Sequence, residues 1–327
     1  MLSVFPIKAF RDNYIWCIQD SNTRDCIIID PGDDKPVIKY LASNKLTLKA
    51  ILVTHHHYDH VDGISELLAY AKRHSSDIID VYGPSESKVK SITHPMKQGD
   101  QLTLLGTTFK VNEVPGHTLD HISYYSDHDS QHSSPWLFCG DTLFSFGCGR
   151  LFEGNAEQML SSVSQIKALP PETKFFCAHE YTQTNLEFSL SVDPENKQLQ
   201  QHYELVKSMR AQNQPTIPGH LALESSLSPF LRWDDPTLKV GETMLFTADL
   251  LQYFLSGVPK AEHCLAVTSN LYKTVEGKWE DEIFDLFDIP KRLQPEIIQA
   301  GDVIGKIRED IAQETGISKD CLIITPP

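Results

Sequence analysis

The stretch Thr54-His55-His56-His57-Tyr58-Asp59-His60 holds several side chains that can bind a metal ion. His55 and His57 are two positions apart, so their side chains point to one side of an extended chain, while Asp59 and His60 face a second point. Imidazole and carboxylate groups together suit zinc, iron or manganese. A purification tag would lie at a terminus and would not be interrupted by Tyr and Asp. The pattern therefore indicates a metal site rather than a set of surface histidines.

The elements around this stretch place it where a strand leads into a helix. An apolar run at 50–53 is typical of a buried strand, and an amphipathic run at 64–73 is typical of a helix. Three more apolar runs are each followed by a candidate ligand: 109–114 by His117, 136–139 by Asp141, and 175–178 by His179. Open α/β folds carry their chemistry at the carboxyl ends of strands, so we expect four strand ends to converge on one rim.

The candidate ligands divide into two groups with a bridge between them. His55, His57 and His117 can hold one ion, Asp59, His60 and His179 a second, and Asp141 can bridge because a carboxylate has two oxygens. Two divalent ions about 3.5 Å apart would share a water and lower its pKa toward ~7. Asp59 and Asp141 would then be catalytic as ligands that position the hydroxide. The expected chemistry is metal-assisted hydrolysis of an acyl or related bond.

Other reactive side chains near these motifs leave alternatives open. His121 is either a ligand or the partner in a structural hydrogen bond, and Cys139 and Cys177 are either buried or catalytic. Ser145 lacks the Gly-x-Ser-x-Gly elbow of a serine nucleophile. Side chains expected to point away from the metals or to lie on the surface are His56, Tyr58, His74, His94, His128 and His132.

Composition limits the classes of partner. The chain has 327 residues and a net charge of −15, which argues against nucleic acid or an anionic membrane as the main partner. No apolar run approaches ~18 residues, so we expect no membrane span, and no signal peptide is visible. No CxxC pair occurs among the seven cysteines, and Cys17, Cys26, Cys139 and Cys177 lie in or beside apolar runs, so we expect buried free thiols in a reducing compartment. We expect a cytoplasmic protein and favour a monomer.

The remaining chain predicts further elements. We expect a hairpin of two strands within residues 1–30, a helix near 35–44, and a short strand at 81–83. Leu199, Tyr203, Val206 and Met209 have helical spacing within 196–213, and a loop-like connector follows at 226–236. Later runs predict helices at 245–255, 280–289 and 309–315 and a strand at 321–324.

The motifs at 54–60, Pro-Gly-His-Thr at 115–118, Gly-Asp-Thr-Leu-Phe at 140–144 and Ala-His-Glu-Tyr at 178–181 resemble the metallo-β-lactamase superfamily. The runs 10–14, 147–154 and 179–182 are similar to the glyoxalase II family of that superfamily. The resemblance covers about 1–238. It implies an αββα sandwich with two divalent ions, zinc first and iron or manganese as alternatives, in which all seven ligands divide as grouped above.

The resemblance also implies a substrate. Family members hydrolyse glutathione thioesters, typically S-D-lactoylglutathione to D-lactate and glutathione in the detoxification of methylglyoxal. Arg150 and Tyr181 would contact the glutathione moiety. Other members of the superfamily, such as a lactonase, a sulfur dioxygenase or a nuclease, remain alternatives, as does a non-catalytic scaffold or a fusion with impaired activity.

The carboxyl-terminal part departs from the family pattern. The family's closing Arg-x-x-Lys-Asp helix, which helps to hold glutathione, is absent, and residues 244–327 resemble part of the first lobe of an FGGY-type sugar kinase, closest to rhamnulokinase. We therefore expect a catalytic domain at 1–170, a region at 171–238 with the last ligand and a small helical substrate-binding part, and an α/β tail fragment at 239–327 without kinase activity.

Overall fold

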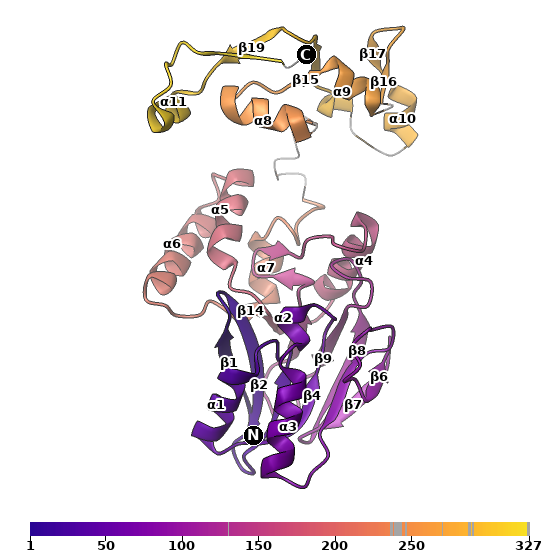
Figure 1. Ribbon diagram of the computed structural model, residues 1–327, viewed down its shortest axis with the longest axis vertical. Coiled ribbons are helices and arrows are strands. Elements are labelled where there is room, and N and C mark those ends of the chain that lie inside the picture. The colour runs from indigo at the N-terminus through magenta and orange to yellow at the C-terminus, as the bar shows by residue number, and fades with distance from the viewer. Residues whose placement is uncertain are drawn as a thin grey trace. The chain divides into compact units, whose positions relative to one another are not determined.

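The structure, a computed structural model, describes residues 1–129, 131–235, 238, 244–245, 247–269, 271–286, 289 and 291–325. The chain forms two compact units, Met1–Leu238 and Lys239–Pro327, which are described separately (Figure 1). The expected boundary at 170/171 falls inside the first unit. Strand β13 (Lys174–Cys177), which follows that boundary, pairs in parallel with β10 (Trp136–Gly140), which precedes it.

The first sheet of unit 1 has six strands in chain order. They are β1 (Leu2–Ala9), β2 (Asn13–Asp20), β3 (Asp25–Ile29), β4 (Thr47–Leu52), β5 (Asp80–Pro84) and β6 (His94–Met96). The expected hairpin is present as β2 and β3, which pair in antiparallel register. The expectation of only two strands before residue 30 is wrong, because β1 pairs with β2 along its whole length, from Leu2 opposite Asp20 to Ala9 opposite Asn13.

The second sheet also has six strands, ordered β14-β13-β10-β9-β8-β7. Those not yet given are β7 (Gln101–Leu104), β8 (Thr107–Glu113), β9 (Ile122–Ser126) and β14 (Gly219–His220). A small ribbon of β11 (Leu143–Phe144) and β12 (Gly147–Cys148) follows β10. Strand β8 buries Phe109 and Val111 and exposes Thr108 and Lys110, the alternation expected of a sheet with one covered face.

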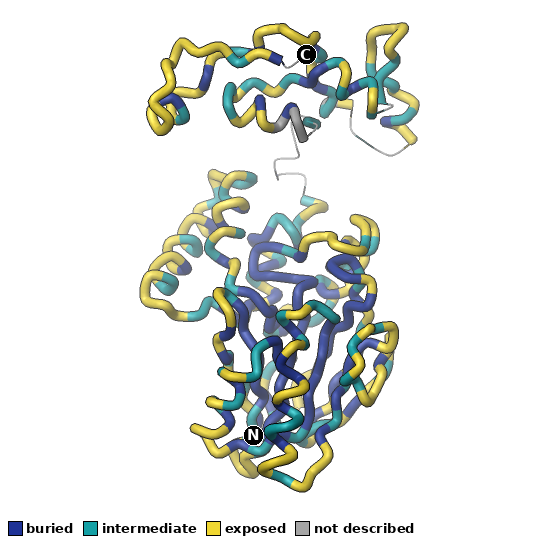
Figure 2. The backbone as a smooth tube through the Cα atoms, viewed as in Figure 1, coloured by how far each residue is buried: buried dark blue, intermediate teal, exposed yellow. Residues whose placement is uncertain are grey.

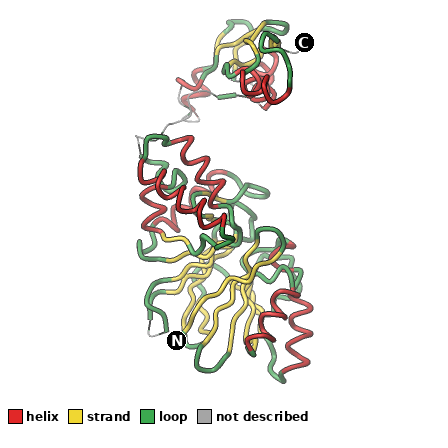
Figure 3. The backbone as a smooth tube through the Cα atoms, turned by 90° about the vertical axis from the view of Figure 1, so that its left-hand side faces the viewer, coloured by secondary structure: helices red, strands yellow, loops and turns green. Residues whose placement is uncertain are grey.

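Helices cover the outer faces of the two sheets, as Figures 1 and 3 show. Val37 and Leu41 of α1 (Asp34–Asn44) and Ile64 and Leu67 of α3 (Ile64–His74) pack in one core with residues of the first sheet. A second core includes the facing sides of both sheets and also the other face of the second sheet, where Met159, Val163 and Ile166 of α4 (Ala156–Lys167) join it. Figure 2 shows this interior as continuously buried chain. The predicted αββα sandwich is confirmed.

The predicted helical region is present within unit 1. It consists of α5 (Thr182–Val192), α6 (Lys197–Ala211) and α7 (Leu221–Leu227). Leu199 and Val206 of α6 are buried, in agreement with their spacing, and pack with Leu186, Leu227 and Phe146. The short α2 (Tyr58–Val61) follows the histidine turn.

Unit 2 combines short helices with three two-stranded sheets. Its elements are α8 (Thr247–Ser256), β15 (Lys260–Glu262), α9 (His263–Thr268), β16 (Tyr272–Lys273), β17 (Lys278–Trp279), α10 (Asp281–Leu286), η1 (Lys291–Leu293), β18 (Glu296–Ile298), β19 (Val303–Lys306), α11 (Glu309–Thr315) and β20 (Leu322–Ile324). The expected helices at 245–255 and 309–315 and the strand at 321–324 correspond to α8, α11 and β20. Residues 246, 287 and 288 of the expected helices lie outside the described residues.

Across these described ranges, no helix has both the length and the apolar character that crossing a membrane requires.

Candidate metal centre

The candidate ligands lie at the carboxyl ends of four strands, as the sequence predicts. Strand β4 leads into the turn that carries His55 and His57. Strands β8, β10 and β13 run in the same direction, because β9 lies antiparallel between β8 and β10 and β13 is parallel to β10. His117, Asp141 and His179 follow these three strands, so the second sheet delivers three ligands to the rim at which the first sheet delivers the histidine turn.

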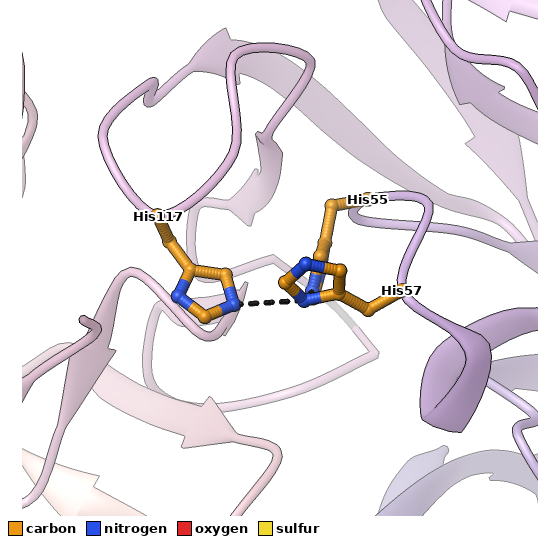
Figure 4. A group of neighbouring side chains, drawn as sticks. All are labelled: His55, His57 and His117. Carbon is orange, nitrogen blue, oxygen red and sulfur yellow. Dashed lines mark hydrogen bonds between the residues drawn. The ribbon is translucent and has the colours of Figure 1, made fainter. Parts of the chain in front are cut away.

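The first group brings three imidazole rings together (Figure 4). The Nδ1 atom of His57 lies 3.1 Å from Nε2 of His55 and 3.0 Å from Nε2 of His117. These atoms are close enough for a single ion to contact all three. His55 is fully buried and His117 nearly so, whereas His57 is partly exposed.

The second group adds carboxylates, and Asp141 touches both groups. Nε2 of His179 lies 3.5 Å from Oδ2 of Asp59, and Nε2 of His60 lies 3.8 Å from the same oxygen. Oδ1 of Asp141 is 3.5 Å from His60 Nε2, while its Oδ2 is 3.3 Å from His179 Nε2 and 3.4 Å from His117 Nε2. Asp141 therefore has oxygens near histidines of both groups, and its bridging of two ions stays a prediction.

Unsatisfied buried atoms at the centre fit bound cations. Nε2 of His60 and Oδ1 of Asp141 are buried and make no hydrogen bond among the described residues. A buried polar atom without a partner costs about 1–3 kcal/mol, so a native site of this kind calls for an ion or another partner. The donor set of imidazole nitrogens and carboxylate oxygens is one that zinc, iron and manganese accept.

The electrostatics of the two groups differ. Burial and neighbouring histidines lower the pKa of His55, His57 and His117, which favours the neutral imidazole that binds metals. Burial opposes a charge on His179, but Asp141 and Asp59 outweigh it and raise the pKa of His179 to about 10. Burial likewise opposes ionisation of Asp141, yet His60 and His179 hold its pKa well below the usual range. The carboxylates thus draw positive charge to the centre.

Further side chains fix the orientation of the ligands. Both oxygens of Asp30 accept hydrogen bonds from Thr54, one from its backbone N–H and one from its hydroxyl, each at 2.7 Å. Thr54 Oγ1 lies within hydrogen-bond distance of Nδ1 of His55, at 3.0 Å, whereas Oδ2 of Asp30 lies 3.1 Å from Nδ1 of His60 as an ion-pair contact without hydrogen-bond geometry. Metal-binding histidines are commonly held through their second ring nitrogen in this way.

Two more contacts of this kind come from the first residue of β2 and from the turn that precedes it. Oδ1 of Asp12 lies 3.0 Å from Nδ1 of His179, and the Asn13 amide donates to Oδ2 of Asp59 at 3.0 Å. Sequence reasoning missed Asp12, Asn13 and Asp30. Asp30 alone carried a signal, because it too ends an apolar strand-like run, at 26–29.

The side chains left open by the sequence take structural roles. Nε2 of His121 accepts a hydrogen bond from the backbone N–H of Asp141 at 3.1 Å, which supports the structural alternative. Cys139 and Cys177 are fully buried, and burial raises the pKa of both thiols, which fits packing rather than catalysis. The expectation that His132 lies on the surface is wrong, because its ring is buried and stacks on Trp136 at 3.8 Å.

An open cavity of about 780 Å³ adjoins the ligands. Besides five of the ligands, its lining includes Tyr58, Phe144, Cys148, Arg150, Phe152, Tyr181, Thr184 and Asn185. Arg150 is exposed and forms no ion pair within 4.0 Å among the described residues. Tyr181 stacks on the ring of His179 at 4.9 Å. Of the two side chains that alternate with the candidate ligands, Tyr58 is exposed and lines the cavity, whereas His56 is not part of its lining.

Comparisons with known proteins agree with this geometry. Residues 10–179 match the metallo-beta-lactamase superfamily, and residues 180–251 match the hydroxyacylglutathione hydrolase C-terminus. The chain is 50% identical over 236 residues to a hydroxyacylglutathione hydrolase of Vibrio parahaemolyticus, covering 72% of this chain and 88% of the relative. A Vibrio cholerae protein of the same name is 48% identical over 238 residues, covering 73% and 89%.

A solved structure shows the same fold. The BLEG-1 B3 metallo-beta-lactamase aligns with a TM-score of 0.51 at 22% identity, over 71% of this chain and 99% of that protein.

Proposed function

Because this chain belongs to the hydroxyacylglutathione hydrolases of the metallo-β-lactamase superfamily, we propose that it hydrolyses S-(2-hydroxyacyl)glutathione to a 2-hydroxy acid and glutathione. The observation that carries the proposal is the convergence of seven ligand-type side chains beside an open cavity, with Asp141 in contact with both groups. S-D-lactoylglutathione is the expected substrate, and D-lactate the expected acid.

Two divalent ions are assigned to the two groups. His55, His57 and His117 would hold one ion, Asp59, His60 and His179 would hold the other, and Asp141, which lies within 3.5 Å of His60, His117 and His179, would serve both. When bound, such a pair of ions lowers the pKa of water and polarises a carbonyl oxygen. Asp59 and Asp141 would act as metal ligands that position the hydroxide. Zinc is the favoured metal, with iron and manganese as alternatives that the same donor atoms accept.

The cavity supplies the substrate contacts. Arg150 lines it, and its guanidinium can form a charge-assisted hydrogen bond with a peptide carboxylate of the substrate. The ring of Tyr181 stacks on His179, and its phenol also lines the cavity. A thiolate is a modest base, since a thiol has a pKa near 8.5, so departure of glutathione needs no strong general acid.

Unit 2 is assigned no part in the chemistry, because none of the seven proposed ligands lies in residues 239–327. The likeness of this segment to a sugar-kinase lobe stays a prediction. We also propose a monomer that works in the cytoplasm. The buried thiols of Cys17, Cys26, Cys139 and Cys177, none of them in a disulfide, suit a reducing compartment.

Two measurements on the purified protein test the function. We expect elemental analysis to give about two divalent ions per chain. We expect the ultraviolet absorbance of S-D-lactoylglutathione to fall as the thioester is cleaved, with one thiol released per thioester lost. Full metal content without any turnover of the thioester would refute the proposed activity. It would leave a lactonase, a dioxygenase or an inactive fusion as alternatives, which the 50% identity to named hydroxyacylglutathione hydrolases disfavours.

A further inference from the structure

His56 lies between two proposed ligands but faces away from them. Its ring sits between two carboxylates, with Nδ1 2.9 Å from Oδ1 of Asp120 and Nε2 3.5 Å from Oε1 of Glu153. The three residues come from three separate loops, at 53–57, 114–121 and 149–155. The imidazole is therefore a bridge between these loops.

Both carboxylates are themselves held in place. The Thr118 hydroxyl donates to Oδ1 of Asp120 at 2.7 Å, and the backbone N–H of Leu119 donates to Oε2 of Glu153 at 3.0 Å. The Asp120 side chain is almost fully buried, and that of Glu153 is about one-third exposed. A carboxylate with a fixed second partner can hold the imidazole in one orientation.

The same loops carry or contact the three histidines of the first metal group, His55, His57 and His117. His56 stands between His55 and His57 in the chain, so fixing its side chain restricts the backbone on which both ligands are mounted. The second loop carries His117, and the backbone carbonyl of Arg150 in the third loop lies 2.8 Å from Nδ1 of His117. Backbone N–H groups of Phe152 and Glu153 also donate to the carbonyl of His117, at 3.1 and 3.4 Å.

We infer that His56, Asp120 and Glu153 form a clasp that positions the imidazoles of His55, His57 and His117 for their ion. The clasp residues are positioning residues, since none of them lines the cavity. The inference rests on the metal assignment made under the proposed function. It predicts that loosening the clasp weakens one of the two metal groups and leaves the other, built from Asp59, His60 and His179, intact.

Two variants loosen the clasp and one preserves it. His56→Ala removes the bridge, and Glu153→Ala removes one of its ends. Glu153→Gln keeps both contacts, because the amide oxygen still accepts from Leu119 and the amide NH₂ can donate to Nε2 of His56. His94→Ala is the matched control. His94 lies 3.7 Å from a carboxylate of Asp80 in an exposed position on the first sheet and does not line the cavity.

The main readout is metal binding, measured by titrating the demetallated full-length chain with Zn²⁺ against a chromophoric chelator. Loss of a group that orients a metal ligand typically weakens metal affinity by about 10–100-fold. We expect His56→Ala and Glu153→Ala to weaken one of two Zn²⁺ equivalents by that factor. Glu153→Gln and His94→Ala should keep both equivalents at the affinity of the unchanged chain.

Kinetics at saturating Zn²⁺ give a second readout. A misplaced ion lowers kcat, while binding of glutathione at Arg150 and Tyr181 should leave KM within about twofold. If the unchanged chain binds Zn²⁺ but does not cleave the thioester, the proposed function fails and the titration still decides on the clasp.

Three results would overturn the inference. The first is unchanged affinity for both Zn²⁺ equivalents in His56→Ala and Glu153→Ala. The second is weakening in Glu153→Gln as large as in Glu153→Ala. The third is a third Zn²⁺ equivalent that these variants lose, since the atoms of His56, Asp120 and Glu153 are close enough to hold a cation themselves. If His56→Ala does not fold, the two Glu153 variants decide.

Discussion

Glu224 is a carboxyl group shielded from solvent, and its titration should make the stability of the chain depend on pH. It lies in α7 with 1% of its surface exposed. Its oxygens accept hydrogen bonds from the Ser145 hydroxyl at 2.7 Å and from the backbone N–H of Phe146 at 2.9 Å. Burial outweighs these donors and raises the pKa of Glu224 from 4.5 to about 7.

The sign of the effect follows from this raised pKa. The folded chain keeps the Glu224 proton to a higher pH than the unfolded chain does, so this group favours folding most below pH 4.5. That contribution is lost as the pH rises toward about 7 and stays constant above it. At about 1.4 kcal/mol per pH unit, the whole interval corresponds to about 3.5 kcal/mol of unfolding free energy, of which about 2.5 kcal/mol falls between pH 5 and pH 8.

The substitution Glu224→Gln removes the titration while keeping an oxygen that accepts from Phe146. We expect the free energy of unfolding of Glu224→Gln, minus that of the unchanged chain, to rise by about 2.5 kcal/mol between pH 5 and pH 8. Urea denaturation at several pH values measures both curves, and contributions of the metal ligands cancel in the difference. Glu195→Gln, at an exposed position, controls for the loss of a charge. Parallel curves for Glu224→Gln and the unchanged chain would refute the reasoning.

Three other perturbations have definite expected outcomes. Asp141→Ala should lose at least one ion by elemental analysis, because Asp141 contacts His117 of one group and His60 of the other, and undiminished metal with full activity would remove it from the bridging position. Arg150→Ala should raise KM for the thioester by about 10–100-fold with a smaller change in kcat, since a charged hydrogen bond contributes about 1.5–3 kcal/mol. An unchanged KM in steady-state kinetics would mean that the carboxylate of the substrate does not bind at Arg150. A chain ending at Leu238 should keep its metal and most of its kcat, because unit 1 contains all seven proposed ligands, and a large loss of either would make unit 2 integral to the hydrolase.

The grouping of the candidate ligands at strand ends could be predicted from sequence because the relevant signals are local. Each apolar run ends within a few residues of its ligand, so residue type and strand end are read together at 50–60 or 136–141. Their convergence followed from a general property of α/β sheets. Helix α4 also carried a local signal that went unused, since Asn155 and Gln158 form a capping box at its start.

The missed features depend on contacts between distant parts of the chain. Asp12 reaches His179 across 167 positions, and nothing in residues 10–14 alone indicates that partner. Strand β1 contains Pro6 and exposes several of its side chains, so its pattern is weak. It lies at the edge of the sheet, where a proline is tolerated. The sequence around His132 is typical of a polar surface, and its burial depends on partners such as Trp136, on which its ring stacks, the hydroxyl of Ser126 and the backbone carbonyl of Ser134.

The origin of the ligands from both sheets has a consequence for folding. His55 and His57 follow a strand of the first sheet, and His117 follows a strand of the second. The first and last proposed ligands in the chain, His55 and His179, are separated by more than a hundred residues. An ion bound by such a set acts as a cross-link that forms only after the two sheets have docked, because a partly assembled sandwich offers incomplete coordination. Metal capture should then be the last step of folding, and mutations that loosen the docking of the sheets should appear first as faster metal loss, before any loss of secondary structure.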